Sequence, residues 1–136
     1  MSTGVYDVFY EFATDEKKEV DGIDITLAPG VGFRVARVGN DRYTARMVEE
    51  MDKHAEELAK KTPASVELDK ELTLQVRAET ILLDFWGMSY QGVPTPYSVE
   101  NAKKFLRLKD FRTRVLTEAT KFENYRVAQE AQRGED

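Results

Sequence analysis

The stretch that most constrains the fold runs from Phe85 to Ser98 and reads F-W-G-M-S-Y-Q-G-V-P-T-P-Y-S. It holds the only tryptophan of the chain and two of its four prolines. Gly87 is suited to end an apolar helix that runs into Trp86, and the two prolines restrict the backbone that follows to an extended path up to Ser98, which can cap the next helix. The sequence therefore predicts a rigid aromatic corner between two helices. Its structural residues are Trp86, Gly92, Pro94, Pro96, Tyr97 and Ser98.

Length and composition limit the classes of protein to consider. With 136 residues, 41% of them hydrophobic, we expect a single domain over residues 1–128 and a frayed polar tail over residues 129–136. The chain has no cysteine, which excludes disulfides and thiolate metal sites and fits a reducing cytoplasm. No apolar run is long enough to span a membrane and no leader pattern is present, so we expect a soluble protein without a membrane partner.

Residues 1–39 are predicted to form a β-rich segment. Aromatic and β-branched residues, or apolar residues alternating with polar ones, favour short strands. The connections between them are a charged stretch over Asp15 to Glu19 and a turn over Ala28 to Gly32. The predicted strands are Val5 to Phe12, Ile23 to Leu27 and Phe33 to Val38.

Residues 40–128 are predicted to form a helical core of four helices. Asn40 or Asp41 can cap the first helix, and this helix ends at Thr62-Pro63. Apolar stripes predict a second helix over Ser65 to Trp86. The fold class is thus mainly α, a four-helix core with a small N-terminal antiparallel β region, which makes it α+β.

The two helices after the corner are predicted from their caps and their apolar spacing. Ser98 opens the third helix and Asp110 caps the fourth. Their inward positions recur at helical spacing. These positions are Ala102, Phe105 and Leu106 on the third helix, and Phe111, Val115, Ala119 and Phe122 on the fourth.

The residues that could carry catalysis are few. His54 is the only histidine, and because it lies near an apolar helix stripe we favour a packing role over a general base or metal ligand. Without a second histidine or a cysteine, neither a catalytic triad nor a zinc site can be completed. Gly30-Val31-Gly32 lacks the rest of a phosphate-loop pattern and indicates a turn. We therefore expect no enzymatic activity, no cofactor and no metal.

The N-terminal segment is the first candidate for partner binding. Its large apolar side chains point to both faces of the predicted strand, so they are either covered by the helices or shared with another subunit. Met88 and Tyr90 at the corner are further candidates, because adaptable side chains suit an interaction surface. The candidate partner-binding residues are Val5, Tyr6, Val8, Phe9, Tyr10, Phe12, Met88 and Tyr90.

A basic stretch is the second candidate. Six positive charges fall within twelve residues, at Lys103, Lys104, Arg107, Lys109, Arg112 and Arg114. Solvated helix faces are the favoured interpretation, since the formal net charge of the chain is −5 and no aromatic residue is interleaved to stack bases. An acidic protein partner, or the acidic part of a neighbouring copy, is an alternative. Nucleic acid is not expected as a partner.

Residues 30–125 resemble the tail assembly chaperones of long-tailed, non-contractile bacteriophages. The resemblance lies in the order V-G-F-R-V-A-R-V-G-N-D-R-Y, a charged helix, L-L-D-F-W-G-M, the corner and a final helix with Phe122. Its most specific part comprises Trp86, Gly92, Pro94, Pro96-Tyr97-Ser98 and Glu100-Asn101-Ala102.

The resemblance implies a small, largely helical, non-enzymatic protein. Such a chaperone binds the tape measure protein and the tail tube protein in the host cytoplasm of an infected bacterium, and it does not remain in the mature virion. The apolar N-terminal segment is compatible with that role or with a homo-oligomer. Two alternatives remain: a structural head–tail or tail-terminator component retained in the virion, which would form a closed ring, and a small nucleic-acid-binding regulator that uses the basic stretch.

Overall fold

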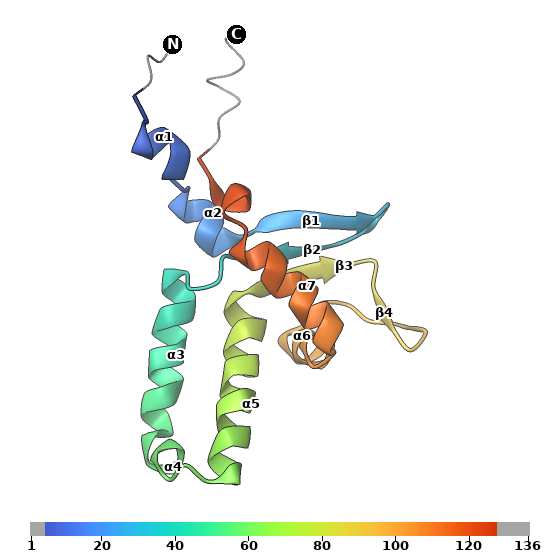
Figure 1. Ribbon diagram of the computed structural model, residues 1–136. Coiled ribbons are helices and arrows are strands. Elements are labelled where there is room, and N and C mark those ends of the chain that lie inside the picture. The colour runs from blue at the N-terminus through green and yellow to red at the C-terminus, as the bar shows by residue number, and fades with distance from the viewer. Residues whose placement is uncertain (1–4, 128–136) are drawn as a thin grey trace.

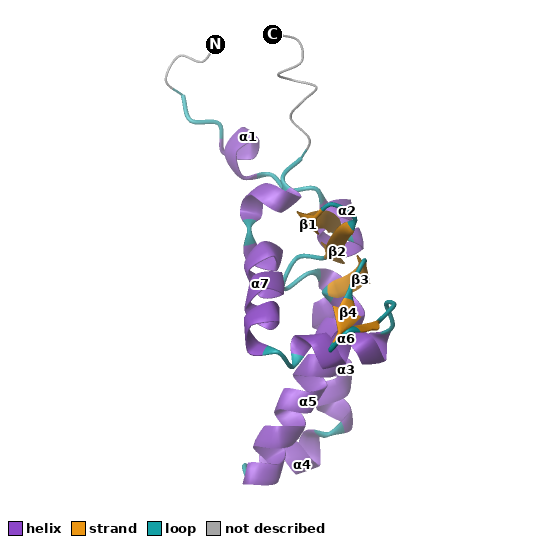
Figure 2. Cartoon of the chain, turned by 90° about the vertical axis from the view of Figure 1, so that its right-hand side faces the viewer, coloured by secondary structure: helices purple, strands orange, loops and turns teal. Residues whose placement is uncertain are grey.

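The computed structural model describes residues 5–127 of the chain. About 58% of these residues are helical, and a small antiparallel sheet accounts for most of the strands. A long helical hairpin projects from the sheet, and helix α7 (Lys109–Thr120) crosses one side of the sheet (Figure 1). Seen from the side, α7 and the sheet form two layers (Figure 2). The prediction of an α+β fold is confirmed. The tail predicted to fray, residues 129–136, lies outside the described residues.

The N-terminal segment contains two helices as well as two strands. Its elements are α1 (Val8–Phe12), α2 (Glu16–Asp21), β1 (Ile23–Ala28) and β2 (Val31–Val35). The strand predicted over Val5 to Phe12 is therefore wrong. The connector predicted over Asp15 to Glu19 is wrong as well, because the carboxylate of Asp15 accepts hydrogen bonds from the amides of Lys17 and Lys18 and so caps α2.

The elements from residue 40 onward are more mixed than predicted. They are α3 (Asp41–Lys53), α4 (Ala55–Ala59), α5 (Pro63–Thr80), β3 (Leu82–Trp86), β4 (Ser89–Tyr90), β5 (Val93–Pro94), α6 (Val99–Leu106), α7 (Lys109–Thr120) and the 3₁₀ helix η1 (Phe122–Tyr125). This region is therefore not purely helical, since it supplies the third strand of the main sheet and a separate β4–β5 hairpin.

The main sheet has the order β1-β2-β3 with antiparallel pairing throughout. Phe33 of β2 stands opposite Ile25 of β1 and Phe85 of β3. The two strands predicted near residues 23–27 and 33–38 are confirmed, although β2 begins at Val31 and ends at Val35. The turn predicted between them is also present, at Pro29 and Gly30.

The helix predicted over Ser65 to Trp86 ends six residues early. Thr80 is the last residue of α5, and its hydroxyl donates to the carbonyl of Val76 at 2.7 Å. From Leu82 the chain pairs with β2 instead, because a strand beside β2 completes the backbone hydrogen bonds of the sheet. Pairing with β2 thus overrides the apolar spacing, which favoured a continuous helix. At its other end α5 starts at Pro63, capped by Thr62, whose hydroxyl accepts from the amide of Ser65.

Caps define the remaining helices. Asn40 caps α3 by accepting from the amide of Tyr43 at 3.0 Å, as predicted, but His54 separates α3 from α4 within the span predicted as one helix. Ser98 caps α6 by accepting from the amide of Asn101 at 3.0 Å, as predicted. The cap predicted at Asp110 is wrong, because α7 begins at Lys109 and its N-cap position is Leu108.

The core joins the sheet to α5, α6 and α7. It is formed by Phe33, Val35, Ala78, Ile81, Leu82, Phe85, Ala102, Phe105, Leu106, Val115 and Ala119, all of which are buried. None of these residues comes from α3, which instead packs along α5 in the projecting hairpin (Figure 1). The helices therefore cover a central sheet, and the α3–α5 hairpin extends beyond the core.

Candidate interaction surfaces

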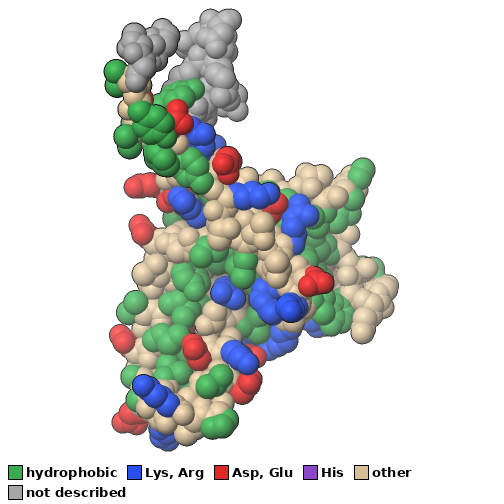
Figure 3. All heavy atoms as spheres, viewed as in Figure 1, with side chains coloured by type: hydrophobic (Ala, Val, Ile, Leu, Met, Phe, Trp, Pro, Cys, Tyr) green, Lys and Arg blue, Asp and Glu red, His purple; other side chains and the backbone are tan. Residues whose placement is uncertain are grey.

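The N-terminal apolar cluster is the most exposed apolar surface of the described chain. It consists of Val5, Tyr6, Val8, Phe9, Tyr10 and Phe12, whose exposed fractions are 75%, 64%, 63%, 71%, 37% and 57%. Helix α1 buries none of its residues. Figure 3 shows the apolar side chains gathered over α1, at the end of the molecule away from the α3–α5 hairpin. Core burial, one of the two sequence-based interpretations of this segment, is therefore wrong for the folded chain.

The local sequence explains why this segment is a helix. The carboxylate of Asp7 accepts a hydrogen bond from the amide of Tyr10 at 3.2 Å and caps α1. Val5, Val8, Phe9 and Phe12 recur at the spacing of one helix face. The sequence held this signal, but the aromatic and β-branched composition favoured a strand. An amphipathic helix with its apolar face in solvent is the observed result.

The C-terminal segment fixes α1 to the rest of the molecule. Phe12 packs against Phe122 with ring centroids 5.9 Å apart, and the guanidinium of Arg126 donates to the carbonyl of Tyr10 at 2.8 Å. Next to α1, the amide of Asp15 donates to the carbonyl of Tyr125 at 2.7 Å. The cluster is therefore held at a defined place on the surface.

An ion pair also stabilises the region next to α1. The hydroxyl of Thr14 donates to the carboxylate of Glu19 at 2.7 Å, and the guanidinium of Arg37 donates to the same carboxylate at 2.7 Å. The hydrogen bond from the Thr14 hydroxyl contributes most, and together with the contact to Arg37 it holds the pKa of Glu19 below its usual value. Glu19 therefore stays ionised and links α2 to the segment that follows β2.

The aromatic corner is anchored by Tyr97. Its ring packs edge-on against Phe85, with centroids 5.2 Å apart. Its hydroxyl lies 3.1 Å from the carbonyl of Ala78 and 3.0 Å from that of Leu82, so it can donate to either at the α5–β3 junction. Burial raises the pKa of Tyr97, which keeps this donor protonated. The side-chain amide of Asn101 donates to the carbonyl of Pro96 at 2.8 Å and completes the corner.

Trp86 occupies a different place from the one predicted. Its ring packs on the backbone of Gly32, where an added Cβ would lie only 2.7 Å from the indole. It remains partly exposed and faces Pro94 and Pro96 across a shallow hollow. Trp86 therefore covers the end of β2 and is not a member of the buried core.

The β4–β5 hairpin carries the other predicted partner-binding residues. Gln91 and Gly92 form its turn with φ of 51° and 82°. Tyr90 stacks on Phe105 with centroids 5.9 Å apart, and the ammonium of Lys104 lies 5.1 Å from the centre of its ring. Met88 is likewise partly buried against the core. Both residues are engaged within the chain, at the corner and away from α1 (Figures 1 and 2).

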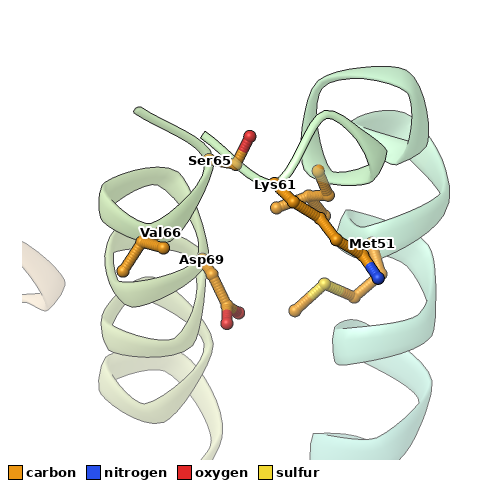
Figure 4. A pocket seen from close by; sticks show the side chains of 6 residues that line it. Met51, Lys61, Ser65, Val66 and Asp69 are labelled. Carbon is orange, nitrogen blue, oxygen red and sulfur yellow. The ribbon is translucent and has the colours of Figure 1, made fainter. Parts of the chain in front are cut away.

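Sequence reasoning missed a hollow near the end of the helical hairpin. It is lined by Met51 and Leu58 on one side and by Ser65, Val66 and Asp69 on the other, with Lys61 between them. Figure 4 shows the side chains of Met51 and Asp69 directed into the space between α3 and α5. Met51 and Leu58 belong to the apolar stripe of the first predicted helix. The apolar spacing did not indicate that α5 would leave the side chains of Met51 and Leu58 partly uncovered.

The described chain has few of the groups that catalysis needs. No set of three or more His, Cys, Asp or Glu residues within residues 5–127 could hold a metal ion. The ring of His54 lies 3.9 Å from a carboxylate oxygen of Glu50 on the hairpin surface. Among the described helices, none has the length and apolar character required to cross a bilayer.

Fold and surface together define a small α+β protein with exposed apolar side chains at one end and a projecting helical hairpin. The protein-family model described as YdaY prophage protein matches residues 38–135, well over half of the chain, and the chain belongs to this family. It is therefore a phage-derived protein. The match begins just before α3 and leaves α1, α2, β1 and β2 outside it. Comparison with curated proteins and with solved structures gave no match.

Proposed function

We propose that this phage-derived protein is a tail assembly chaperone. It binds the tape measure protein and the tail tube protein during tail morphogenesis, in the host cytoplasm, and leaves before the virion is complete. It acts by binding and not by catalysis. The phage family and the resemblance at the corner support this proposal.

One observation carries the proposal: the N-terminal apolar cluster is exposed although it is anchored. Helix α1 buries none of its residues, and an exposed apolar patch of this kind marks a surface that another protein covers. Together these six side chains expose roughly 700 Å², taking about 200 Å² for a fully exposed aromatic side chain. This is close to the roughly 800 Å² that each partner contributes to a standard protein interface.

The geometry of the cluster favours a helical partner. Val8 and Phe9 lie about one turn before Phe12 in α1, so the cluster presents an apolar helix face. Such a face packs well against the apolar stripe of another helix. A tape measure protein with long helices offers many such stripes before it is enclosed in the tail tube. Self-association of the chain through the same cluster is a second use of this surface.

The proposal is tested by co-expressing the chain with the tape measure protein of the same prophage. In the test variant, Val8→Asp and Phe9→Asp replace two cluster side chains that are 63% and 71% exposed. In the control variant, Val48→Asp and Val93→Asp likewise introduce two aspartates in place of apolar side chains, at positions that are 56% and 64% exposed elsewhere. We expect the test variant to lose at least about tenfold in capture, since two buried apolar side chains contribute roughly 3 kcal/mol or more.

The controls decide how the result is interpreted. Both variants should keep the helical circular dichroism of the wild type, because neither change touches the core. Equal capture by wild type and test variant would contradict the proposal. Sedimentation of the same variants without the tape measure protein reports whether the cluster also joins two copies of the chain.

One observation favours the second candidate, a structural head–tail or tail-terminator component. Strand β1 lies at the edge of the sheet and pairs only with β2 within the described residues. A free edge can pair with a neighbouring subunit when a closed ring forms. A protein of this kind would be retained in the virion, which is the outcome that separates the two candidates.

A further inference from the structure

A groove of mixed charge lies between α5 and the turn that joins α6 to α7. It has a volume of about 470 Å³, with Leu74 and Thr73 of α5 on one side and Arg107 and Arg112 on the other. Arg77, in the last turn of α5, lines the same groove. Figure 3 shows basic side chains gathered over the α6–α7 junction on this face.

Two of the three acidic residues that line the groove are already paired with basic side chains. The ammonium of Lys70 lies 3.6 Å from the carboxylate of Glu67, and the guanidinium of Arg107 lies 3.0 Å from that of Glu71. The third, Asp69, lines both this groove and the hollow between α3 and α5, toward which Figure 4 shows its side chain directed. The carboxylates of the groove therefore neutralise only part of its positive charge.

Two arginines of the groove, Arg77 and Arg112, have no acidic partner within residues 5–127. Within residues 5–127, the guanidinium of Arg77 makes neither an ion pair nor a hydrogen bond, although the side chain is half-buried. Arg112 donates only to the backbone carbonyl of Leu106, at 2.9 Å. A guanidinium has five N–H donors, so both side chains keep most of their hydrogen-bonding capacity. An external carboxylate would complete it.

We propose that this groove docks an acidic segment of a partner protein. Carboxylates of the segment pair with Arg77 and Arg112, which can bind them through two parallel hydrogen bonds each. An apolar side chain of the same segment packs on Leu74 at the floor of the groove. The occupant is therefore an acidic amphipathic helix, in which carboxylates and apolar side chains alternate at helical spacing. This surface is separate from the N-terminal apolar cluster and does not depend on it.

The same chemistry argues against nucleic acid as the occupant. Glu67 and Glu71 border the groove and leave only two guanidiniums open to an anion, whereas a phosphate backbone carries one charge per nucleotide. A protein segment with a few carboxylates matches the two available guanidiniums better.

The test uses a fluorescent synthetic helix of about 18 residues with glutamates and leucines at helical spacing. Its binding to the full chain is measured by fluorescence anisotropy. We expect Arg77→Glu with Arg112→Glu to weaken binding at least about tenfold, and raised salt to weaken it further because the contacts are charged. The control, Lys17→Glu with Lys60→Glu, changes the net charge equally at side chains that are 83% and 62% exposed elsewhere, and binding should stay unchanged.

Several outcomes would overturn the proposal. They are no detectable binding, equal loss in the control variant, equal binding of a peptide with lysines in place of its glutamates, and tighter binding of a DNA duplex that the same arginine variant abolishes. If the double variant loses its helical circular dichroism, Arg77→Glu alone gives the answer, because this guanidinium makes no hydrogen bond or ion pair within the described residues. Retained peptide binding by a folded Arg77→Glu variant would also overturn the proposal.

Discussion

Replacing Tyr125 by phenylalanine tests how the C-terminal segment is held to the sheet. Tyr125 is fully buried, and its hydroxyl donates to the carbonyl of Val35 in β2 at 3.1 Å. Its own carbonyl accepts from the amide of Asp15 at 2.7 Å. The side chain thus connects the last described element to β2, while its backbone connects to the segment that carries α1.

The expected magnitude follows from what the substitution removes. Tyr125→Phe keeps the ring but deprives a buried carbonyl of one donor, which costs about 1–3 kcal/mol in the free energy of unfolding. Tyr125→Ala also leaves a cavity and should cost roughly 3–5 kcal/mol. For a chain of this length each kcal/mol lowers the melting temperature by roughly 3–4 °C.

The pH dependence gives a second measurement of the same contact. Burial raises the pKa of Tyr125 above its usual value near pH 10. The folded chain therefore prefers the protonated phenol, so this contribution to stability is complete below about pH 10 and is lost as the pH rises further. The advantage of the wild type over Tyr125→Phe should shrink as the pH rises above about 10.

The assay is urea unfolding of both proteins, followed by circular dichroism at several pH values. An unchanged midpoint for Tyr125→Phe at neutral pH would refute the reasoning. So would a stability difference that does not depend on alkaline pH, because a buried phenol must resist ionisation.

Two further substitutions test other parts of the fold. Phe85 is 3% exposed and stacks on Phe105 with centroids 4.7 Å apart, so Phe85→Ala should lower the free energy of unfolding by about 3–5 kcal/mol. Trp86→Ala should lower it by about 1–3 kcal/mol, because the indole is partly exposed. Thermal melting compares the two variants, and a larger loss for Trp86→Ala would show that Trp86 is the anchor of the corner. Glu19→Gln should cost about 1–2 kcal/mol at neutral pH. Because the folded pKa of Glu19 is lowered, its contribution is present above about pH 4.5 and lost in acid, so the variant should lose less stability on acidification, and parallel acid profiles would contradict this.

The sequence predicted the parts of the fold that local chemistry decides. Alternating residues around Ile25 and Phe33 form neighbouring strands, and Asn40 and Ser98 cap the helices that follow them. These features depend on hydrogen bonds and side-chain periods within a few residues. They can be read without knowing the rest of the fold.

The errors arose where distant residues decide the structure. Phe85 has the spacing of the preceding helix, but it lies in β3 because β2 offers an edge for pairing and Gly32 leaves room for Trp86. For residues 5–12, propensity favoured a strand that has no partner to pair with, and the cap at Asp7 gave a helix instead.

The candidate surfaces were predicted only in part. The large apolar side chains between Val5 and Phe12 were recognised as a partner-binding segment, but their exposure follows from how α1 is anchored by Phe122 and Arg126, more than 100 residues away. The groove beside Arg77 was not predicted, because Arg77 and the basic stretch meet only in the folded chain. Sequence spacing cannot reveal which charges remain unpaired after folding.

The central claim is that the protein assists tail assembly and then leaves. Quantitative mass spectrometry of particles produced on prophage induction, compared with complexes captured during assembly, tests this most directly. The account predicts that the protein accompanies the tape measure protein in the assembling complexes and is absent from purified particles. A fixed copy number in purified particles would contradict the chaperone and support the structural component.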